Sequence, residues 1–569
     1  MPHHDDPLAA ARWHPEPELI AFGDEAAARA ALERLGEETW RTALDYLYRE
    51  GVRRGVAPVT YPELRERYFA PSGGGPSPAP ERPTPSSEIL AEFRERLAPY
   101  LLNAYHPGSF AYFTPPPLAM SIAGEVLAQW ANQGIDVWSC GPVGALVEEE
   151  VIRWLCDLVG YDRGPGGPGT DAAAPESFGV LTSGGTMANI MGLMITREVH
   201  LPRVQAVATA GLHPAAALDP AAMTAAGLRP YPPPPRGAAL EGWRLYASDQ
   251  AHFSIAKALD FLGFPAATLA VVPSDGRFRL RGAPVAAQIE ADLAAGLRPL
   301  AISAVAGSTN TGSVDATAEL ADVAARHGLW LHVDAAYGGA ALLSERDAPR
   351  VPDLARADSI TIDPHKWFFQ AYDIGGLLVR RRDDLEQTFH RAPEYYRTAH
   401  HEERPLNWYE LALEGTRRWR ALKLWMSWKH LGTPGLGRLV EHNDDLAAHL
   451  ADRIAAADDL EAIPAGRPEL SVVCFRHLPG GRSRAAAIEA ADPDALDRYT
   501  DRLATLLQHS GEGWLSTTVL RGRTYLRAGI VNFLSSPAAV DAILDGLRRL
   551  APDAAREAGL PAVGRRASP

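Results

Sequence analysis

Short apolar runs, many of them β-branched, recur through the middle of the chain, and each has the length of one buried strand. Helical patterns separate several of these runs. Because strands that alternate with helices form mostly parallel sheets covered on both faces, the pattern predicts an α/β fold with a mostly parallel central sheet. The predicted strands are residues 178–181, 245–247, 269–272, 301–305, 329–333, 359–362 and 376–379.

Two helices of this region have a clear amphipathic spacing. Residues 187–194 and 320–327 each place side chains at i, i+3, i+4 and i+7, which marks one buried face of a helix. The pattern changes after about residue 385, where longer helices precede short strands and predict a separate, smaller α+β domain. Its predicted helices are 416–431, 436–456 and 538–550, and its predicted strands are 470–475, 515–520 and 525–530.

The first hundred residues have the character of a helical arm, over residues 24–67 and 86–101. Stretches rich in Pro, Gly and Ala are predicted as loops or linkers at residues 71–87, 164–175 and 214–237. Together these features predict four parts: a helical N-terminal arm (residues 1–105), a large α/β domain (106–390), a small α+β domain (391–551) and a flexible tail (552–569).

The charge and cysteine content narrow the classes of partner. The chain has 569 residues and a formal net charge of -14, a surplus that argues against nucleic-acid and membrane partners. Three cysteines are too few for a disulfide framework and fit a reducing, cytoplasmic compartment. Residues 1–7 carry no signal-peptide pattern, so export is not predicted. Adjacent histidines in polar segments are usually solvated, so the pairs at 3–4 and 400–401 predict no metal site.

A glycine-rich turn is the first candidate for chemistry. The segment Thr182-Ser183-Gly184-Gly185-Thr186 ends a predicted strand and opens a predicted helix. Glycine lets the backbone approach a ligand closely, and the free N–H groups at a helix start can hold a phosphate. A plain glycine turn with Thr186 as the N-cap explains the same segment equally well.

A lysine and an aspartate follow two other predicted strands. Lys366 comes after strand 359–362 and beside Trp367; a lysine desolvated there has a lowered pKa and can form a Schiff base, although a solvated loop lysine is the alternative. Asp334 stands at the carboxyl end of strand 329–333, as either an N-cap or a functional anion. A phosphate turn, a Schiff-base lysine and a buried carboxylate for a pyridinium nitrogen are together what pyridoxal phosphate requires.

Six motifs in order resemble the fold-type-I, pyridoxal-phosphate-dependent decarboxylases of the aromatic-L-amino-acid and glutamate decarboxylase superfamily. The resemblance extends from about residue 38 to residue 550, and it implies the fold-type-I transferase architecture, with the cofactor bound in the large α/β domain and buried where two subunits of a homodimer meet. The motifs are residues 106–113, 183–186, 248–252, 307–312, 332–336 and 363–367.

The resemblance also implies a role for each matching residue. Lys366 would form the Schiff base with the cofactor, and Asp334 would pair with the protonated ring nitrogen and keep the ring an electron sink. Further cofactor contacts are implied for His252 on the ring face, for Gly185, Thr186 and His365 at the phosphate, and for Thr309 and Ala336 against the ring. Tyr395 matches the mobile-loop tyrosine that protonates the product, in a polar segment expected to close over the substrate.

Signals for the substrate are mixed. Asp363 stands where the aromatic decarboxylases usually have Asn, which questions a phosphate contact there, and Phe253 is closer to the glutamate, cysteine-sulfinate and diaminobutyrate branches. Trp367 follows the lysine as in the aromatic branch. The aromatic residues Phe110, Tyr112, Phe113 and Trp367 are expected near the site and favour an aromatic substrate, unless they belong to the core.

The sequence therefore predicts a homodimeric carboxy-lyase that converts an L-amino acid, preferably aromatic, to its amine and carbon dioxide. The alternatives are decarboxylation of glutamate, cysteine sulfinate or diaminobutyrate, and transamination, C–C lyase cleavage or aldehyde-forming oxidative deamination on the same fold. A protein that retains the cofactor without turnover is a further alternative.

Overall fold

The computed structural model describes residues 14–19, 24–50, 57–70, 73, 75–161, 176–233, 240–391 and 405–560. Internal contacts divide the chain into two units. Unit 1 consists of Met1–Ala111, His477–Leu526 and Leu534–Pro569, and unit 2 of Tyr112–Arg476 and Arg527–Phe533. The long helix α13, which the sequence placed in the C-terminal domain, thus belongs to the same unit as the large sheet, while the predicted domain boundaries stay a prediction.

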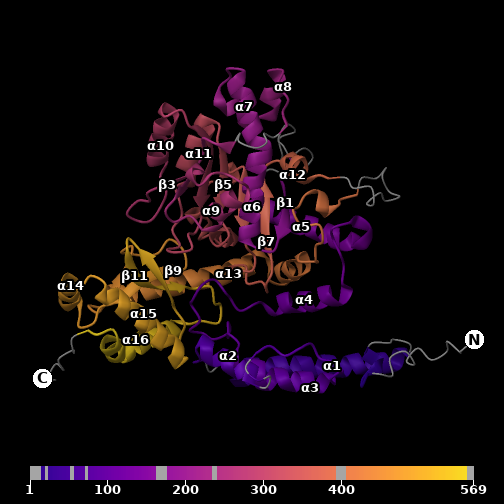
Figure 1. Cartoon of the computed structure of the whole chain (residues 1–569), viewed down its shortest axis with the longest axis vertical. Helices are drawn as coiled ribbons and strands as arrows, with labels where there is room; N and C mark the ends of the chain where they lie inside the picture. Colours follow the sequence, from indigo (N-terminus) through magenta and orange to yellow (C-terminus); the bar gives the residue numbers. More distant parts are fainter. Residues whose placement is uncertain are drawn as a thin grey trace, which may run out of the picture. The chain divides into compact units, whose positions relative to one another are not determined.

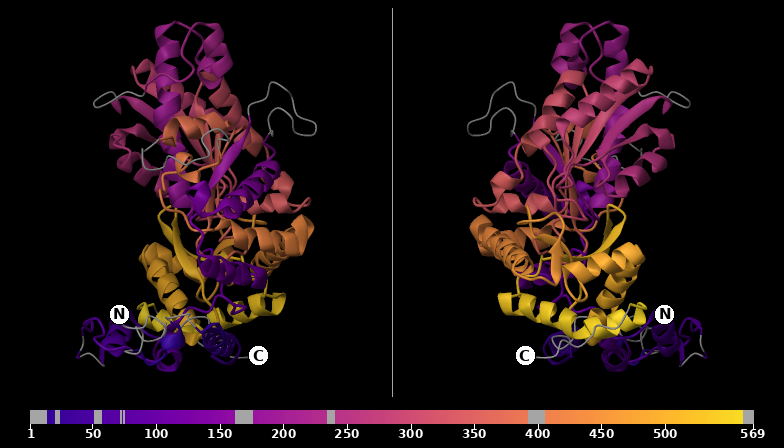
Figure 2. Two further views of the ribbon diagram at one scale, coloured as in Figure 1. Left: turned by 90° about the vertical axis from the view of Figure 1, so that its right-hand side faces the viewer. Right: turned by 90° about the vertical axis from the view of Figure 1, so that its left-hand side faces the viewer.

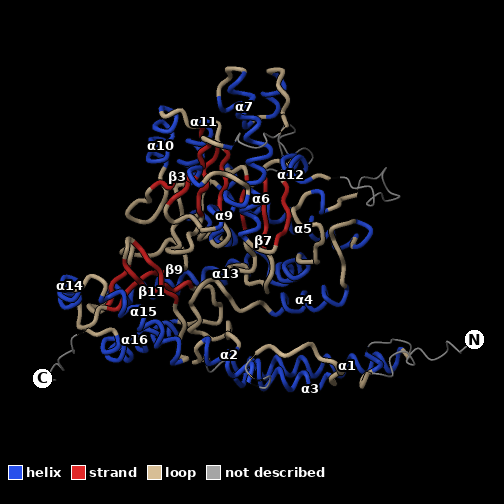
Figure 3. Tube along the Cα trace, viewed as in Figure 1, coloured by secondary structure: helices blue, strands red, loops and turns tan. Residues whose placement is uncertain are grey.

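A seven-stranded sheet forms the centre of unit 2 (Figures 1 and 3), and its strand order is β1-β7-β6-β5-β4-β2-β3. Only β7 is antiparallel to its neighbours; the other pairs are parallel. The mostly parallel sheet and all seven of its predicted strands are therefore confirmed. The strands are β1 (Phe178–Thr182), β2 (Trp243–Ser248), β3 (Leu269–Val272), β4 (Arg298–Val305), β5 (Trp330–Asp334), β6 (Ser359–Ile362) and β7 (Gly375–Val379).

Helices flank this sheet (Figure 2), and its strands are almost wholly buried. The fully buried side chains of unit 2 include Trp243, Trp330 and Trp367. The helices of unit 2 are α4 (Ala119–Ala131), α5 (Pro142–Leu158), α6 (Gly185–Ile195), α7 (Leu201–Thr209), α8 (Pro220–Ala225), α9 (Ser254–Phe261), α10 (Gly282–Ala294), α11 (Thr317–His327), α12 (Arg382–Phe389) and α13 (Ala421–Ala455).

The parallel arrangement brings the carboxyl ends of six strands to one edge of the sheet. Strands β1 and β6 are both antiparallel to β7, so they run in the same direction as each other and as β5, β4, β2 and β3. Ligands of open α/β sheets bind outside this edge. The segments that follow these strands are therefore the ones that can share a site.

Unit 1 contains helices whose starts are capped as their sequences suggest. The Asp24 side chain accepts from the backbone of Ala26 and Ala27, and Thr60 and Glu63 form a capping box. The helices are α1 (Glu25–Asp45), α2 (Tyr61–Phe69), α3 (Ser86–Glu92), α14 (Arg482–Ala491), α15 (Ala495–Ser510) and α16 (Pro537–Glu557). Because α16 continues through Pro552 and buries Ala554 and Ala555, the first residues of the predicted tail are helical.

A second sheet of four strands lies in the later part of the chain, with the order β10-β11-β9-β8. Three of its strands match predicted ones. The strands are β8 (Leu460–Ala462), β9 (Val472–His477), β10 (Ser516–Leu520) and β11 (Arg523–Gly529).

The predicted linker at 214–237 is wrong in its first part. A 3₁₀ helix at Pro214–Leu218 is followed by α8, and Asp219 accepts from the first backbone N–H groups of α8. Ala217 and Met223 are buried against Val207 of α7. Alanine is a strong helix former, and two apolar side chains that reach a neighbouring helix are enough to fix short turns that composition alone assigns to a loop.

Helix α13 contains the two helices predicted at 416–431 and 436–456, joined across a kink. Gly432 has φ +64°, outside the helical region, and Pro434 follows it. The helix begins at Ala421, five residues later than predicted. Across the described residues, no helix combines the length and apolar character needed to span a bilayer.

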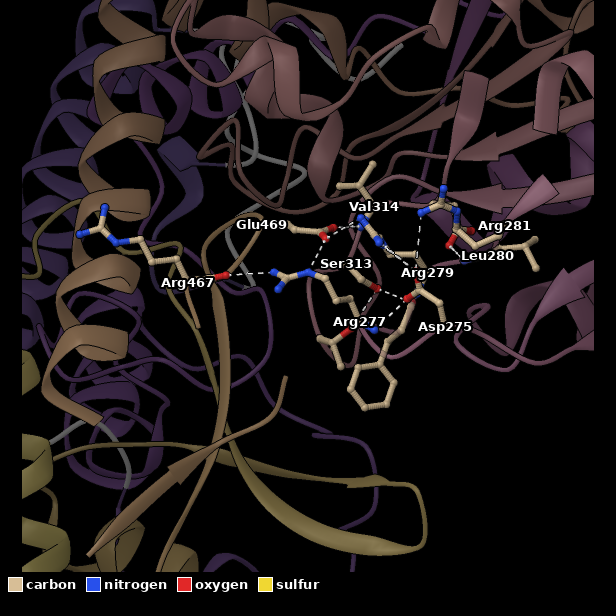
Figure 4. A network of polar contacts seen from close by, with 12 residues as sticks. Asp275, Arg277, Arg279, Leu280, Arg281, Ser313, Val314, Arg467 and Glu469 are labelled. Atoms are coloured by element: carbon tan, nitrogen blue, oxygen red, sulfur yellow. Dashed lines mark hydrogen bonds and ion pairs between the residues drawn. The ribbon is translucent and has the colours of Figure 1, made fainter. Parts of the chain in front are cut away.

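Arginines on the segment after β3 attach it to the residues that precede β9 (Figure 4). Arg277 and Arg279 both approach Glu469, and Arg279 also forms two hydrogen bonds with Asp275. A second oxygen of Glu469 accepts from the backbone of Val314 at 2.7 Å. Several charged contacts thus fix the loop that follows β4.

The end of β1 rests on a buried ion pair. Arg417 donates to the Glu148 carboxylate of α5 at 2.5 Å and to the Leu181 carbonyl at 2.6 Å, and Glu148 accepts from the Leu181 N–H at 3.1 Å. Both side chains are fully buried. Burial raises the pKa of Glu148 even though Arg417 acts to lower it. An unpaired charge at either position would therefore be costly.

Replacing Arg417 by Met is expected to lower the free energy of unfolding by about 3–5 kcal/mol, because Glu148 would stay buried without its partner. The double variant Glu148→Gln, Arg417→Met should recover part of this loss. Arg356→Met, which removes an exposed pair with Asp322, is the control and should cost less than about 1 kcal/mol. Urea unfolding followed by circular dichroism measures all three. Equal losses for Arg417→Met and the control would contradict the assignment.

Candidate active site

A cavity of about 400 Å³ lies outside the carboxyl ends of β1, β2, β4, β5 and β6. Its lining contains all eight residues that the resemblance assigns to the cofactor: Gly185, Thr186, His252, Thr309, Asp334, Ala336, His365 and Lys366. Side chains from five separate segments therefore meet in one place. Further lining residues are Ser183, Gly184, Met187, Asn189, Phe253, Val305, Gly307, Tyr337 and Asp363.

The turn before α6 leaves space that side chains would fill. A Cβ atom at Gly185 would lie 2.8 Å from Asp363 Oδ2, and one at Gly184 would lie 3.1 Å from His365 Cε1. No side chain caps the first N–H groups of α6. Free N–H groups at a helix start, with room in front of them, suit an anion such as a phosphate. The residues present thus fit the phosphate of pyridoxal phosphate.

Lys366 reaches the cavity beside an acid. Its Nζ lies 3.0 Å from Asp363 Oδ2, and 22% of the side chain is exposed. Burial acts to lower the pKa of Lys366, but the negative charges of Asp363 and Asp334 and the hydrogen bond to Asp363 outweigh it and raise that pKa. The sequence predicted a lowered pKa for Lys366, and this prediction is wrong. It considered burial but not the charge of Asp363, which lies three residues earlier in the chain and beside the amine in space. Asp363 is directed at this amine.

Asp334 ends β5 and is held at both carboxylate oxygens. Oδ1 accepts from the Ala336 N–H at 3.1 Å, and Oδ2 accepts from Asn189 Nδ2 at 2.8 Å. The residue is only 6% exposed. A buried carboxylate with fixed orientation at this position suits a protonated ring nitrogen.

His252 follows β2 and is oriented by Ser254. Its Nδ1 lies 2.7 Å from Ser254 Oγ, and the ring packs against Phe253. Burial lowers the pKa of His252, although the charge of Asp334 acts to raise it. The imidazole is therefore neutral at physiological pH.

His365 is the third titratable side chain at the turn. The Ile374 N–H donates to its Nδ1 at 3.3 Å, which places the proton of the neutral ring on Nε2, 3.7 Å from Asp363 Oδ2. Burial lowers its pKa. A neutral N–H donor therefore stands beside Gly184, where the resemblance expects a phosphate contact.

None of the four aromatic residues expected at the site is among the described residues that line the cavity: Phe110, Phe113 and Trp367 are buried in the core, and Tyr112 is exposed. Phe113, Tyr337 and Trp367 form a continuous stack, with ring centroids 4.2 Å and 4.9 Å apart. Phe113 and Trp367 are buried and do not line the cavity; Tyr337 and Phe253 do. The argument for an aromatic substrate from Phe113 and Trp367 is therefore wrong.

Gly307 shows why the loop after β4 has its sequence. It has φ +91°, and a Cβ atom there would lie 2.7 Å from the Tyr337 ring and 2.9 Å from the Gly338 nitrogen. Only glycine satisfies both constraints. The residue lets the loop that carries Thr309 pass close to the segment after β5.

Two residues that hold the site together escaped the sequence analysis. Asn189 and Ser254 contact Asp334 and His252, as described above. Two features of the sequence could have identified them: Asn189 is a polar residue within the predicted helix 187–194, and Ser254 places a hydroxyl two residues after His252. Tyr395 lies outside the described residues, and its role as proton donor stays a sequence-based prediction.

Comparisons with known proteins agree with this site. Residues 72–219 and 238–478 match the pyridoxal-dependent decarboxylase conserved domain. The chain is 29% identical over 455 residues to an aromatic-L-amino-acid decarboxylase of Bacillus atrophaeus, covering 80% of this chain and 83% of the relative. It is 31% identical over 475 residues to an L-2,4-diaminobutyrate decarboxylase of Rhizobium meliloti, covering 83% of each.

Solved structures share the fold. Oryza sativa TDC with PLP and tryptamine has a TM-score of 0.76 at 25% identity, over 92% of this chain and 98% of that one. Mouse CSAD has a TM-score of 0.74 at 25% identity, over 92% and 99%.

The fold and the site define a fold-type-I protein that binds pyridoxal phosphate, as the sequence predicted. The chain belongs to the pyridoxal-dependent decarboxylase family and is a carboxy-lyase acting on an amino acid.

Replacing Asp363 by Asn is expected to lower the pKa of Lys366, because the nearest negative charge disappears while burial remains. In cofactor-free protein, the rate at which an amine reagent modifies Lys366 should then reach its plateau at lower pH than in the parent. Peptide mapping by mass spectrometry at several pH values measures this rate. Asp275→Asn, which removes an acid outside the cavity, is the control. An unchanged pH profile in Asp363→Asn would sink the explanation.

Proposed function

We propose that the protein decarboxylates L-amino acids with aromatic side chains to the corresponding amines and carbon dioxide. The supporting observation is the composition of the cavity wall: its described residues include Phe253, Tyr337 and Met187 but no arginine, and Lys366 is its single lysine. A buried acidic side chain needs a cationic partner. Substrates such as glutamate or cysteine sulfinate would find none among these described residues beyond the lysine assigned to the cofactor.

The proposed roles follow the geometry of the chain's own residues. Lys366 would hold the cofactor covalently, Asp334 would face its ring nitrogen, and His252 would lie on its ring face. The phosphate would be held by Gly185, Thr186 and His365, and the ring would contact Thr309 and Ala336. When bound, pyridoxal phosphate supplies an electron-accepting ring for the electron pair released as carbon dioxide leaves.

The residues around the cavity then manage charge and protons. Asp334 keeps its orientation through Asn189 and Ala336, so that its charge stays on the ring-nitrogen side. Neutral His252 can donate from Nε2 because its Nδ1 is engaged by Ser254. Lys366 is held beside Asp363, so a proton can pass between the amine and this carboxylate. These groups bind and orient the substrate, whereas Tyr395 is the predicted source of the final proton.

A homodimer is part of the proposal. Helices α4 and α5 both pack on α13, and between them they expose Val126, Leu127, Trp130, Val143 and Leu146, each at 46–65%. Exposed apolar side chains concentrated on neighbouring helices are typical of protein interfaces. The occupant proposed for them is a second copy of this chain, which light scattering coupled to gel filtration measures.

Decarboxylation of L-2,4-diaminobutyrate is the second candidate. A relative with that name is 31% identical, slightly more than the aromatic relative. Both oxygens of Asp334 are held by Ala336 and Asn189, and Asp363 Oδ2 lies beside Lys366. Asp363 Oδ1 has no hydrogen-bond partner among the described residues, but it is buried against Gly375 and Gly184 rather than turned to the open cavity. We therefore rank it below the aromatic substrates.

Lys366→Ala is expected to abolish the borohydride-reducible attachment of the cofactor, because the lysine is the single amine lining the described cavity. The parent protein should be yellow and should yield a modified Lys366 peptide after reduction. Lys257→Ala, an exposed lysine on α9, serves as the control and should retain the linkage. A stable reducible linkage in Lys366→Ala would refute the assignment.

A panel of the twenty amino acids plus diaminobutyrate tests the substrate. We expect amine and carbon dioxide from tryptophan, tyrosine or phenylalanine, with kcat/KM at least about tenfold above that of any acidic substrate, since an uncompensated buried charge costs more than 1.4 kcal/mol. Mass spectrometry distinguishes the amine from an aldehyde or keto acid. Preferential turnover of glutamate or diaminobutyrate would overturn the proposal, as would aldehyde as the main product.

A further inference from the structure

Asn189 uses every hydrogen-bonding position of its side chain. Its Nδ2 donates to Ser254 Oγ and to Asp334 Oδ2, both at 2.8 Å. Its Oδ1 accepts from Thr361 Oγ1 at 2.6 Å and lies 2.9 Å from His332 Nε2. The residue is 1% exposed. A primary amide has two donor hydrogens and one acceptor oxygen with two lone pairs, so this amide is fully satisfied.

The surrounding hydroxyls fix the direction of each hydrogen bond. Ser254 Oγ receives a hydrogen from Asn189, and the Ser254 N–H points at Nδ1 of His252 at 3.4 Å. Nδ1 therefore accepts, and the Ser254 hydroxyl, 2.7 Å away, directs its own hydrogen to it. The neutral ring then carries its proton on Nε2. The amide on α6 therefore orients the hydroxyl that bonds Nδ1 and so favours the His252 tautomer with its proton on Nε2.

The other side of the amide is ordered in the same way. Trp330 Nε1 donates to Ser359 Oγ at 2.9 Å, which leaves the serine hydrogen for Nδ1 of His332 at 2.8 Å. His332 then donates from Nε2 to Asn189. Burial lowers the pKa of His332 to about 4, so this ring is neutral. These contacts hold the Asn189 oxygen on the sheet side and its NH₂ group toward Asp334 and Ser254.

The helix is shaped to permit this arrangement. Gly192 lies one turn after Asn189, and a Cβ atom there would come within 2.8 Å of the His332 ring. Helix α6 packs directly on β5, β6 and α9, the elements that carry the partners of the amide. A buried asparagine without such partners would cost free energy. The position is therefore built around an amide.

We propose that Asn189 is a positioning residue that orders both faces of the cofactor site at once: it orients the Asp334 carboxylate directly and favours one His252 tautomer through Ser254. The inference rests on the proposed placement of Asp334 and His252 around the cofactor, and it does not depend on which amino acid is the substrate. Loss of the amide should disturb cofactor affinity and the protonation behaviour of the site together.

Asn189→Asp tests the donor function, because it keeps the shape and the Oδ1 acceptor but replaces the NH₂ group by oxygen. Two carboxylates 2.8 Å apart repel each other strongly when both are ionised at high pH, and a shared proton restores the contact with Asp334 as the pH falls. We expect the cofactor dissociation constant of the full-length holoenzyme to rise about tenfold or more at pH 8, and to recover toward the parent value near pH 6. The pH titration of the visible absorption band should shift with it.

Thr196→Val is the matched control, because it removes a buried hydroxyl from the same helical segment that bonds only to the Gly192 carbonyl. The dissociation constant and the visible titration should both stay within about twofold of the parent values. Since a tenfold change corresponds to about 1.4 kcal/mol, a twofold change is within experimental scatter. A merely structural role for Asn189 would make Asn189→Asp resemble this control, with a lowered melting temperature and an unchanged pH titration. That result would overturn the inference.

Ser254→Ala decides the question if Asn189→Asp does not fold. It removes the hydroxyl that directs His252 and leaves the contact between Asn189 and Asp334, so cofactor affinity should stay within about threefold while the pH profile of kcat shifts. An unchanged kcat profile would refute the link through His252. A holoenzyme that shows the expected shifts in cofactor binding but has no turnover on any amino acid would overturn the proposed function and leave this inference standing.

Discussion

A charged carboxylate has to remain buried at the end of a central strand, and much of unit 2 is arranged around that requirement. Asp334 terminates β5, which lies between β4 and β6 in the sheet, and it lines the cavity with only 6% of the residue exposed. Burying such a group is costly unless hydrogen bonds replace its water. The backbone of Ala336 supplies one bond and Asn189 the other, so a helix that is otherwise apolar must carry an amide at this position. The need for Gly192 opposite His332 follows from the same contact, since the helix has to lie close to the strand.

The distribution of charge in the cavity follows from burial rather than from residue type. Burial lowers the pKa of His252, His332 and His365, so none of the three imidazoles competes with Lys366 as a cation. The lysine keeps its proton because Asp363 and Asp334 are near. The positive charge of the described cavity lining is thus concentrated on Lys366, and the imidazoles are oriented N–H donors. This difference in charge explains why His252 and His365, from two separate segments, can line the cavity beside Lys366 without repelling it.

Much of this could be predicted from the sequence, and the failures share a cause. The seven strands were predictable because buried parallel strands are continuous apolar runs, and the meeting of the eight candidate residues in one cavity was predictable because their segments follow such strands. The pKa of Lys366, the core position of Trp367 and the role of Asn189 were not readable, because each depends on what another segment places nearby. Asn189 contacts a residue 145 positions away and another 65 positions away. The short helices at 214–225 were predicted as a linker, because a segment rich in alanine and proline is as typical of a linker as of a capped helical turn.

The contact between Arg417 and the end of β1 has a consequence for the order in which the protein can be made. Leu181 and Arg417 are separated by 236 positions, and β1 joins the sheet through β7, whose register pairs Phe178 with Val379. The strand that carries the phosphate turn therefore leaves the ribosome long before its partners do, and it must wait without a sheet to join. At a synthesis rate of about 5–20 residues per second, that wait lasts on the order of ten seconds or more. The cavity is consequently one of the last parts of unit 2 to assemble, and the nascent chain has to keep an apolar strand protected until then.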